Sequence, residues 1–178
     1  MLKRSTYIIG ALAILFLSAV GYFFFVKWQG NFHPITPGEA YRSAQLDRDD
    51  IAHYVTKYSI KSVLNLRGSR SGERWYDDEL AACAELQVAH YDVELSEAHE
   101  PTDIQVRQLV HIFETAPRPL LIHCMSGADR TGLAAAMWKV VVDKERKAEA
   151  ANQLSIRYGH IPIWETQAMD SFFEKWNP

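Results

Sequence analysis

The chain has 178 residues, of which 48% are hydrophobic, a size and composition that suit one compact domain with a small addition. Its formal charge is −3, and three of its 19 basic residues (Lys3, Arg4 and Lys27) belong to the N-terminal segment, which leaves 16 against 22 acidic residues, or −6, for the rest. This acidic balance excludes a general nucleic-acid-binding protein and gives no support for strong attraction to anionic lipid.

An apolar segment opens the chain. Residues 7–26 contain no Asp, Glu, Lys or Arg, and 20 residues match the ~20 that a helix needs to cross a bilayer core. We therefore expect residues 1–28 to form a single transmembrane helix that anchors the protein. Lys3 and Arg4 precede the apolar residues, which predicts a cytoplasmic N-terminus and an exported domain. A cleaved signal peptide is the alternative, because Ser18 and Ala19 are small, but the apolar stretch continues beyond them.

The remainder of the chain alternates between strand and helix patterns. Residues 29–38, with Pro34, Pro37 and Gly38, are predicted to be a linker, and residues 39–178 to form one domain. Extended or strand patterns occur at 39–46, 60–66, 88–95 and 120–122, and apolar positions at helical spacing follow each of them. Asp47 and Thr102 are placed to cap two of these helices. A last helix carries Met169, Phe172, Phe173 and Trp176 on one face.

One stretch joins a buried strand directly to a helix through a short loop. Leu120, Leu121 and Ile122 form an apolar run, and helical spacing begins near Arg130 or Thr131. A strand-loop-helix turn directs backbone N–H groups and the positive end of the helix dipole at one point. The sequence therefore predicts an anion site in this loop.

Two side chains make the loop chemically specific. Cys124 stands at its entrance and Arg130 at its end, with five residues between them. A helix N-terminus and a neighbouring cation favour the thiolate form of a cysteine, which is its nucleophilic form. A guanidinium can hold two oxygens of a phosphoryl group and stabilise the transition state. We expect the Cys124 sulfur to attack a phosphate monoester, giving a phosphocysteine intermediate that water hydrolyses.

The sequence His123-Cys124, five residues, Arg130-Thr131-Gly132 resembles the signature of the cysteine-dependent protein tyrosine and dual-specificity phosphatases. Two upstream segments, 41–45 and 64–67, are similar to the small bacterial dual-specificity branch, and the resemblance covers residues 36–176. It implies an α/β fold with a central, mostly parallel sheet flanked by helices, no metal, no cofactor, and a carboxylate general acid on a separate loop. In that branch, the exported side of the membrane is the periplasm.

We call the loop from Cys124 to Arg130 the phosphate cradle. The general acid must reach the leaving oxygen from outside this cradle, because that oxygen departs on the side opposite the thiolate. Glu97 lies on the loop where the family carries its acid, although the family usually has Asp there. Asp129 lies inside the cradle beside Arg130, as in the myotubularin-type loop. Asp92 falls within a predicted strand, and Asp103 suits the first turn of a helix. The expected order of candidates is Glu97, Asp129, Asp92, Asp103.

Further residues are expected to contact the substrate or support the loop. The expected substrate-binding residues are the loop positions and two others: Met125, Ser126, Gly127, Ala128, Thr131 and Arg67. Arg67 follows the carboxyl end of a strand, where ligands gather in doubly wound sheets, and it occupies a family-like position. Thr131 is a candidate donor to the thiolate or a plain helix-entry hydroxyl, and His123 is expected to be structural.

Cys83 is expected to be a core residue of a helix over 73–87, on the same face as Tyr76, Leu80 and Ala84. The alternative to a free core thiol is a disulfide between Cys83 and Cys124, which an oxidising compartment would allow and which would inactivate the enzyme. The histidines other than His123 show no metal-ligand spacing, so no metal site is expected.

The sequence thus predicts a membrane-tethered, exported phosphatase of dual-specificity type that acts on phosphotyrosine, on phosphoserine or phosphothreonine, or on small phosphomonoesters. A phospholipid head group is the alternative substrate, although the loop lacks the lysines that lipid-selective relatives often place there. An inactive phosphate-binding module and a sulfur-transfer or arsenate-reducing enzyme are the other classes. The intact Cys124 and Arg130 argue against an inactive binding module. The ending Asp129-Arg130-Thr131-Gly132 argues against a sulfur-transfer or arsenate-reducing enzyme.

Overall fold

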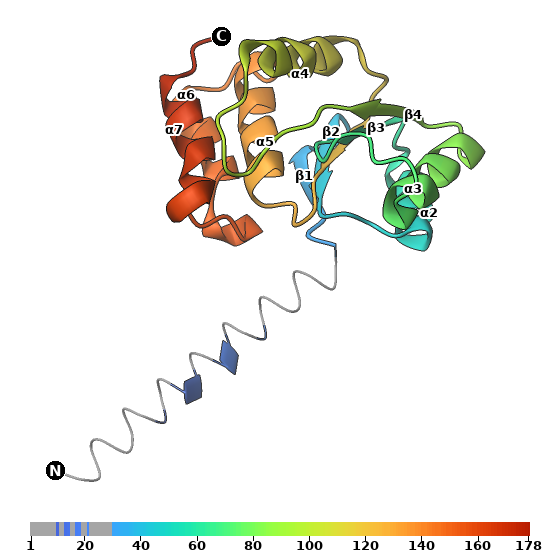
Figure 1. Ribbon diagram of the computed structural model, residues 1–178, viewed down its shortest axis with the longest axis horizontal. Coiled ribbons are helices and arrows are strands. Elements are labelled where there is room, and N and C mark those ends of the chain that lie inside the picture. The colour runs from blue at the N-terminus through green and yellow to red at the C-terminus, as the bar shows by residue number, and fades with distance from the viewer. Residues whose placement is uncertain (1–9, 11–12, 15–16, 19–20, 22–29) are drawn as a thin grey trace, which may run out of the picture.

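The computed structural model describes residues 30–178 and, within the N-terminal segment, residues 10, 13–14, 17–18 and 21. Residues 30–178 fold as a five-stranded sheet with helices on both faces (Figure 1). The predicted transmembrane helix over residues 1–28 falls almost entirely outside the described residues. Among the residues that are described, no helix combines the length and apolar character needed to cross a membrane.

The sheet is mostly parallel, as expected. Its strands are β1 (His33–Thr36), β2 (Ala40–Ser43), β3 (Ser62–Asn65), β4 (Ala89–Asp92) and β5 (Leu120–His123). They lie in the order β1-β2-β5-β3-β4, with β1 antiparallel to β2 and every other neighbour parallel. β5 is therefore the central strand, in accord with its uninterrupted apolar sequence.

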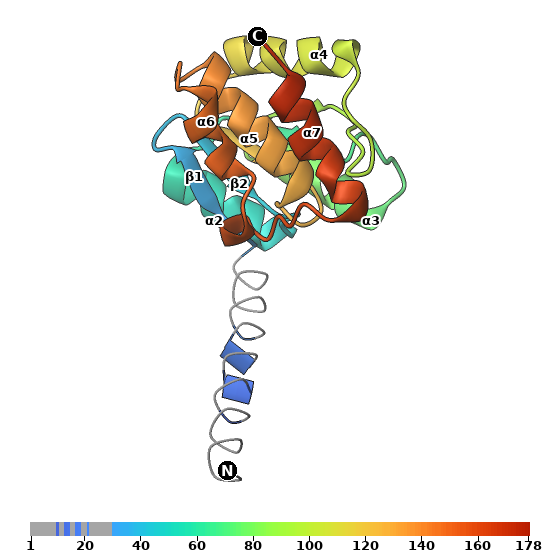
Figure 2. The same cartoon turned by 90° about the vertical axis from the view of Figure 1, so that its left-hand side faces the viewer.

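Helices cover the two faces of the sheet unequally (Figures 1 and 2). One face carries α2 (Arg48–Tyr58) and α3 (Arg74–Glu85), and the other carries α4 (Asp103–Thr115), α5 (Asp129–Val141), α6 (Lys147–Ala150) and α7 (Gln167–Lys175). Short 3-10 turns η1 (Ala151–Gln153), η2 (Ile156–Tyr158) and η3 (Trp164–Thr166) join α6 to α7. Both predicted caps are confirmed: the side chain of Asp47 accepts from Asp50 N, and that of Thr102 from Gln105 N.

Alternate residues of the strands build two hydrophobic cores. In β5, Leu120 and Ile122 belong to the core beneath α4, α5 and α7, whereas Leu121 belongs to the core beneath α2 and α3. Successive side chains of a strand point to opposite faces, so an unbroken apolar strand needs a helical layer on each side. α5 is buried along most of its length, from Thr131 to Trp138.

Part of the predicted linker over residues 29–38 lies inside the domain. It contains β1 and the turn to β2, and Asn31, ahead of β1, is buried. Pro34 is compatible with β1 because this is an edge strand, where a residue without an N–H group costs no central ladder bond. The prediction of a linker was therefore wrong for this part of the segment. The prolines and the glycine belong to a β-hairpin, whose turn has the same composition as a linker.

The parallel strands end at one edge of the sheet. His123, the last residue of β5, pairs in register with Ser43 of β2 and Asn65 of β3, and Asn65 pairs with Asp92 of β4. The segments that follow these strands therefore lie together at the carboxyl edge, where ligands bind in sheets of this type.

Candidate active site

The loop between β5 and α5 is held from outside through its carbonyl oxygens. Arg42 Nη2 donates to Gly127 O at 2.8 Å, Asn31 Nδ2 to Ser126 O at 3.1 Å, and the backbone N–H of Gln45 to Met125 O at 3.3 Å. Because the N–H and C=O of one trans peptide point in opposite directions, the following amides face the inside of the loop. Within the described residues nothing accepts a hydrogen bond from the amides of Ser126 and Gly127.

Arg42 is the main support of the loop, and it is completely buried. Besides Gly127 O, it donates from Nη1 to the backbone and side-chain oxygens of Gln153, at 2.8 and 2.9 Å, and its guanidinium lies 4.0 Å from the centre of the Tyr158 ring. Burial lowers the pKa of Arg42 to about 10, against the opposing effect of Tyr158 and Cys124. The side chain is still cationic at neutral pH, so a buried positive charge lies behind the loop and favours an anion within it.

Gly127 is required by the close approach of the loop to β2. Its φ is +71°, in the left-handed region, and a Cβ at this position would lie 2.6 Å from Ala44 N and 2.7 Å from Ser43 O. These neighbours are backbone atoms that cannot rotate away. The sequence-predicted site residue Gly127 therefore shapes the loop through the absence of a side chain.

Cys124 and Arg130 lie at the two ends of the loop, as predicted. Cys124 is free and buried. Arg130, in the first turn of α5, donates from Nη1 to Leu95 O at 3.4 Å. Arg130 Nε and the hydroxyl of Thr131 are buried, and among the described residues neither has a hydrogen-bond partner. Unpaired buried donors are rare in native proteins, and here two consecutive residues at the start of α5 carry them.

The structure distinguishes the four candidate acids by their partners. Glu97 Oε2 lies 3.1 Å from Arg130 Nη2, so the structure brings the first candidate into contact with the arginine at the end of the loop. Asp92 accepts from Tyr76 Oη at 2.6 Å and from Asn65 Nδ2 at 2.8 Å, and Asp103 is exposed at the start of α4. Asp92 is thus engaged by two partners and Asp103 belongs to the first turn of α4, which leaves Glu97, in contact with Arg130, and Asp129, at the end of the loop.

Asp129 is held by a buried histidine that the sequence analysis did not single out. His160 Nδ1 lies 2.7 Å from Asp129 Oδ1, and its Nε2 lies 2.8 Å from Asp170 Oδ2. Burial lowers the pKa of His160, but the hydrogen bonds with Asp129 and Asp170 outweigh it, and the net shift is upward. A protonated imidazole donates from both nitrogens, so this arrangement keeps Asp129 as an acceptor and fixes the start of α5 to α7.

Arg67 also lies close to the loop, as expected. Its Nη1 donates to Gln45 Oε1 at 3.1 Å, and its guanidinium stacks on the Trp75 ring at 3.4 Å from the centre. Burial lowers the pKa of Arg67, and the charge of Arg130 lowers it further, while Cys124 opposes both. The two arginines are therefore near enough to repel each other, and an anion between them relieves that repulsion.

Glu79 organises the polar contacts behind Cys124, and sequence analysis missed it. The helix over 73–87 was expected to bury Leu80 and Ala84, but Ala84 is exposed and Leu80 only half-buried, whereas Glu79 is buried. Its carboxylate accepts from Gln45 Nε2 at 2.6 Å and lies 2.8 Å from His90 Nε2 and 3.1 Å from His123 Nε2. The sequence signal that could have revealed Glu79 is a carboxylate on the helix face that packs against the domain, because a buried carboxylate needs hydrogen-bonding or charged partners.

The two cysteines are both free in this structure, so the alternative disulfide is not formed. Cys83 packs in the core beneath α2 and α3, as predicted, whereas Cys124 belongs to the other core. Burial raises the pKa of Cys83 to about 12. This thiol is therefore unreactive at neutral pH.

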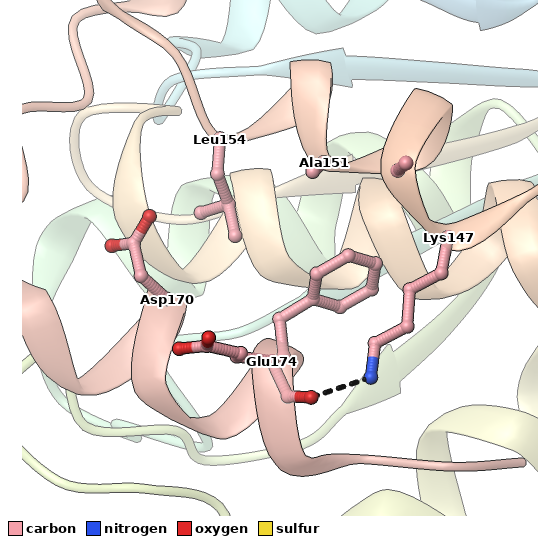
Figure 3. Close-up of a pocket in the computed structure, with 7 residues that line it drawn as sticks. Lys147, Ala151, Leu154, Asp170 and Glu174 are labelled. Atoms are coloured by element: carbon pink, nitrogen blue, oxygen red, sulfur yellow. Dashed lines mark hydrogen bonds between the residues drawn. The ribbon is translucent and has the colours of Figure 1, made fainter.

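A separate surface pocket lies between α6 and α7 (Figure 3). Its wall includes Leu154, Phe173 and Asp170, and Lys147 Nζ donates to Glu174 O at 2.8 Å on one side of it. No residue of the Cys124 loop lines this pocket. This pocket is therefore distinct from the loop between β5 and α5.

The comparison with known families agrees with this geometry. A family model described as "DSP-PTPase phosphatase fused to NAD+ Kinase" matches residues 38–170, which include β2, β5, the Cys124 loop and α5. The chain belongs to this phosphatase family. The resemblance seen in the sequence is thereby confirmed.

Solved structures show the same fold in other phosphatases. TpbA from P. aeruginosa is 22% identical, with a TM-score of 0.67 over 83% of this chain and 85% of that one. The core catalytic domain of the PP-IP phosphatase Siw14 from S. cerevisiae is also 22% identical, with a TM-score of 0.65 over 83% and 85% of the two chains. PTPMT1 is 13% identical, with a TM-score of 0.60 over 81% and 94%. A search among curated proteins gives no match.

Replacing Gly127 tests whether the loop needs its close approach to β2. We expect Gly127→Ala to lower the free energy of unfolding by ~2–4 kcal/mol, because left-handed strain and a backbone clash act together. Gly38→Ala is the matched control: its φ is +79° and a Cβ there meets no atom within 4 Å, so only the strain of ~1 kcal/mol remains. Urea denaturation measures both, and equal losses would show that the clash is absent.

Replacing Glu79 tests the buried carboxylate. Burial raises the pKa of Glu79, but His123 and the hydrogen bonds from His123, His90 and Gln45 outweigh it and hold the pKa well below its usual range. The ionised Glu79 carboxylate therefore stabilises the folded state at pH values above 4.5, the pKa of a glutamate in the unfolded chain. This stabilisation is lost progressively as the pH falls below 4.5. We expect Glu79→Gln to lose ~2–4 kcal/mol of unfolding free energy at pH 7 and progressively less below pH ~4.5.

The control for Glu79 is Asp78→Asn on the same helix. Asp78 forms an ion pair with exposed Arg74, and we expect a loss under ~0.5 kcal/mol. Urea unfolding at several pH values compares the two variants. A Glu79→Gln loss that stayed constant down to acid pH would contradict the assigned ionisation.

Proposed function

We propose that the phosphatase domain hydrolyses phosphomonoesters through a phosphocysteine on Cys124. The observation that carries the proposal is the loop itself. Within residues 30–178, a buried thiol, amides without an acceptor and the unpaired donors Arg130 Nε and Thr131 Oγ1 all belong to the loop and to the first turn of the helix that follows it. A phosphoryl group supplies the oxygens that these donors lack, and Met125, Ser126, Gly127 and Ala128 form the cradle around it.

In the first step the Cys124 thiolate attacks phosphorus. The S–P bond forms as the bond from phosphorus to the ester oxygen breaks, and the leaving alkoxide or phenoxide takes a proton from a general acid. Arg130 moves from Glu97 to the phosphoryl oxygens, where its two parallel donors stabilise the transition state. Arg67 adds a second positive charge at the edge of the cradle.

We assign the general acid to Glu97. Its contact with Arg130 supports this assignment, and its exposed carboxyl group can exchange protons with water. In the second step the Glu97 carboxylate takes a proton from water, the water oxygen attacks phosphorus, and the S–P bond breaks to release phosphate and thiolate. Asp129, which accepts from His160, is the alternative acid.

For the substrate we propose phosphotyrosine or small aromatic phosphomonoesters, with phosphoserine and phosphothreonine as further esters of dual-specificity type. TpbA, which shares the fold, has a structure in complex with pTyr, and this supports the choice of phosphotyrosine. Siw14, also similar in fold, is named a PP-IP phosphatase. Phosphate recognition is the chemistry common to both, and a phospholipid head group is the alternative for this chain.

We further propose that residues 1–28 anchor the protein in a membrane, with the phosphatase domain on the periplasmic side. The support is the uncharged, apolar run over residues 7–26 and the preceding Lys3 and Arg4. No metal or cofactor is needed for the proposed steps, because the nucleophile, the clamp and the acid are all side chains.

Rates with good and poor leaving groups test the mechanism. We expect Cys124→Ser to abolish turnover of aryl phosphates, whereas an inactive phosphate-binding module would show no turnover in the unsubstituted protein either. Glu97→Gln should lower kcat/KM for phenyl phosphate by ~10²–10⁴ and affect 4-nitrophenyl phosphate far less, because its leaving group needs no proton.

Asp103→Asn is the control for Glu97→Gln, because Asp103 is an exposed carboxylate outside the loop. It should leave both substrates unaffected. If Asp129→Asn, rather than Glu97→Gln, showed the selective loss with phenyl phosphate, the assignment of the acid to Glu97 would be wrong while the phosphocysteine mechanism would stand.

A further inference from the structure

Exposed apolar side chains gather beside the Cys124 loop. Across residues 30–178, six large hydrophobic side chains are exposed, and one of them, Ile104, lies at the start of α4. The other five lie on the loop or in the segment 156–164, and together we call them the apolar rim: Met125, Ile156, Ile161, Ile163 and Trp164. Soluble surfaces usually expose such side chains singly. Their concentration at one place indicates a contact surface.

The segment that carries the rim is fixed to the loop. Asn31 Nδ2 donates both to Tyr158 O, at 2.9 Å, and to Ser126 O, at 3.1 Å. Two residues further on, His160 binds Asp129 at the start of α5. The rim therefore keeps its position relative to the anion site. Because Met125 belongs both to the rim and to the loop, a surface that covers the rim also reaches the loop.

Trp164 is presented to the outside by a strained turn. Its side chain is 88% exposed, and its φ of 50° lies in the left-handed region, which a bulky residue rarely adopts. Thr166 Oγ1 holds the turn, at 2.6 Å from Ile161 O and 2.8 Å from Ile163 O. Packing within residues 30–178 gives no reason for this conformation, because the ring meets water. Strain of this kind points to a function outside the domain.

The chain ahead of the domain indicates what covers the rim. The apolar run ends at Val26, and the four residues from there to Gly30 can span at most ~14 Å. Gly30 O accepts from Ala44 N at 2.7 Å, and Asn31 contacts the loop directly. Figures 1 and 2 show the domain beginning at the end of the molecule where the segment between α6 and α7 lies. A bilayer that contains residues 7–26 would therefore lie next to the rim.

We propose that the apolar rim inserts into the interface of a lipid bilayer and holds the Cys124 loop at the level of the head groups. The inference rests on the proposed phosphatase chemistry and on the proposed anchor. Of the two substrate classes given above, it favours the alternative, phosphomonoesters carried by lipids, over phosphotyrosine. Tryptophan is favoured at membrane interfaces, where its ring has one apolar and one polar side. The formal charge of −6 outside the N-terminal segment gives no attraction to anionic lipid, so insertion depends on apolar area and is insensitive to salt.

Tryptophan quenching tests the insertion without any dependence on catalysis. The full chain is reconstituted in phosphatidylcholine vesicles whose acyl chains carry bromine near the head group, and its emission is compared with that of Trp164→Leu. The chain has five tryptophans. The difference in emission between the two proteins is the fluorescence of Trp164. We expect the bromolipid to quench this fluorescence and acrylamide, dissolved in the water, to leave it unquenched. Emission from Trp164 that acrylamide quenches and bromolipid does not would overturn the proposal.

Activity on two substrates completes the test. The double variant Ile163→Ser with Trp164→Ser should lose about tenfold in kcat/KM for phosphatidic acid in vesicles, the equivalent of one buried apolar side chain, and none for a soluble aryl phosphate. Ile104→Ser, equally exposed but on α4, should change neither. If the substitutions instead dissociate a dimer in sedimentation experiments, the rim is a self-association surface and the proposal is wrong. Absence of aryl phosphate hydrolysis in the unsubstituted protein would refute the proposed function, and the quenching result would be unaffected.

Discussion

The architecture depends on one constraint: the backbone between Cys124 and Arg130 must keep its carbonyl oxygens outward and its amides inward. Left alone, this short loop would turn its polar groups to water in many ways. Arg42, Asn31 and the Gln45 amide bind three successive carbonyls from the β1–β2 hairpin and its flanks. The hairpin approaches so closely that only glycine fits at position 127. The cost of burying the Arg42 cation is offset by its hydrogen bonds and by the anion it favours in the loop.

Local features of the site could be predicted from the sequence because local chemistry determines them. The apolar run of β5, the caps Asp47 and Thr102, and the spacing of Cys124 and Arg130 are each legible within a few residues. The supports could not be predicted in the same way. Arg42 reaches Gly127 across 85 residues, and Asn31 reaches Ser126 across 95. No periodicity connects such pairs, so only the register of β2 beside β5 reveals them.

Two misreadings have a common physical origin. The residues over 29–38 were judged by composition, which does not distinguish a linker from an edge hairpin. The inward face of α3 was judged by the spacing of its apolar residues, which does not distinguish an exposed carboxylate from a buried one with hydrogen-bond partners. Glu79 is buried because Gln45, His90 and His123 supply its hydrogen bonds. Such a carboxylate joins α3 to β4 and β5, and in this way the second helical layer contributes to the position of the catalytic loop.

The most direct test of the account is the reactivity of Cys124 towards iodoacetamide across pH 5.5–8, with and without inorganic phosphate. Cys124→Ser identifies the labelled residue, and the buried Cys83 should stay unlabelled in the folded protein. If the loop holds a thiolate in an anion cradle, the rate of alkylation will be nearly constant over this range, and phosphate will protect the sulfur. A rate that rises about tenfold for each pH unit, as for a free thiol below its pKa of about 8.5, with no protection by phosphate, would contradict it.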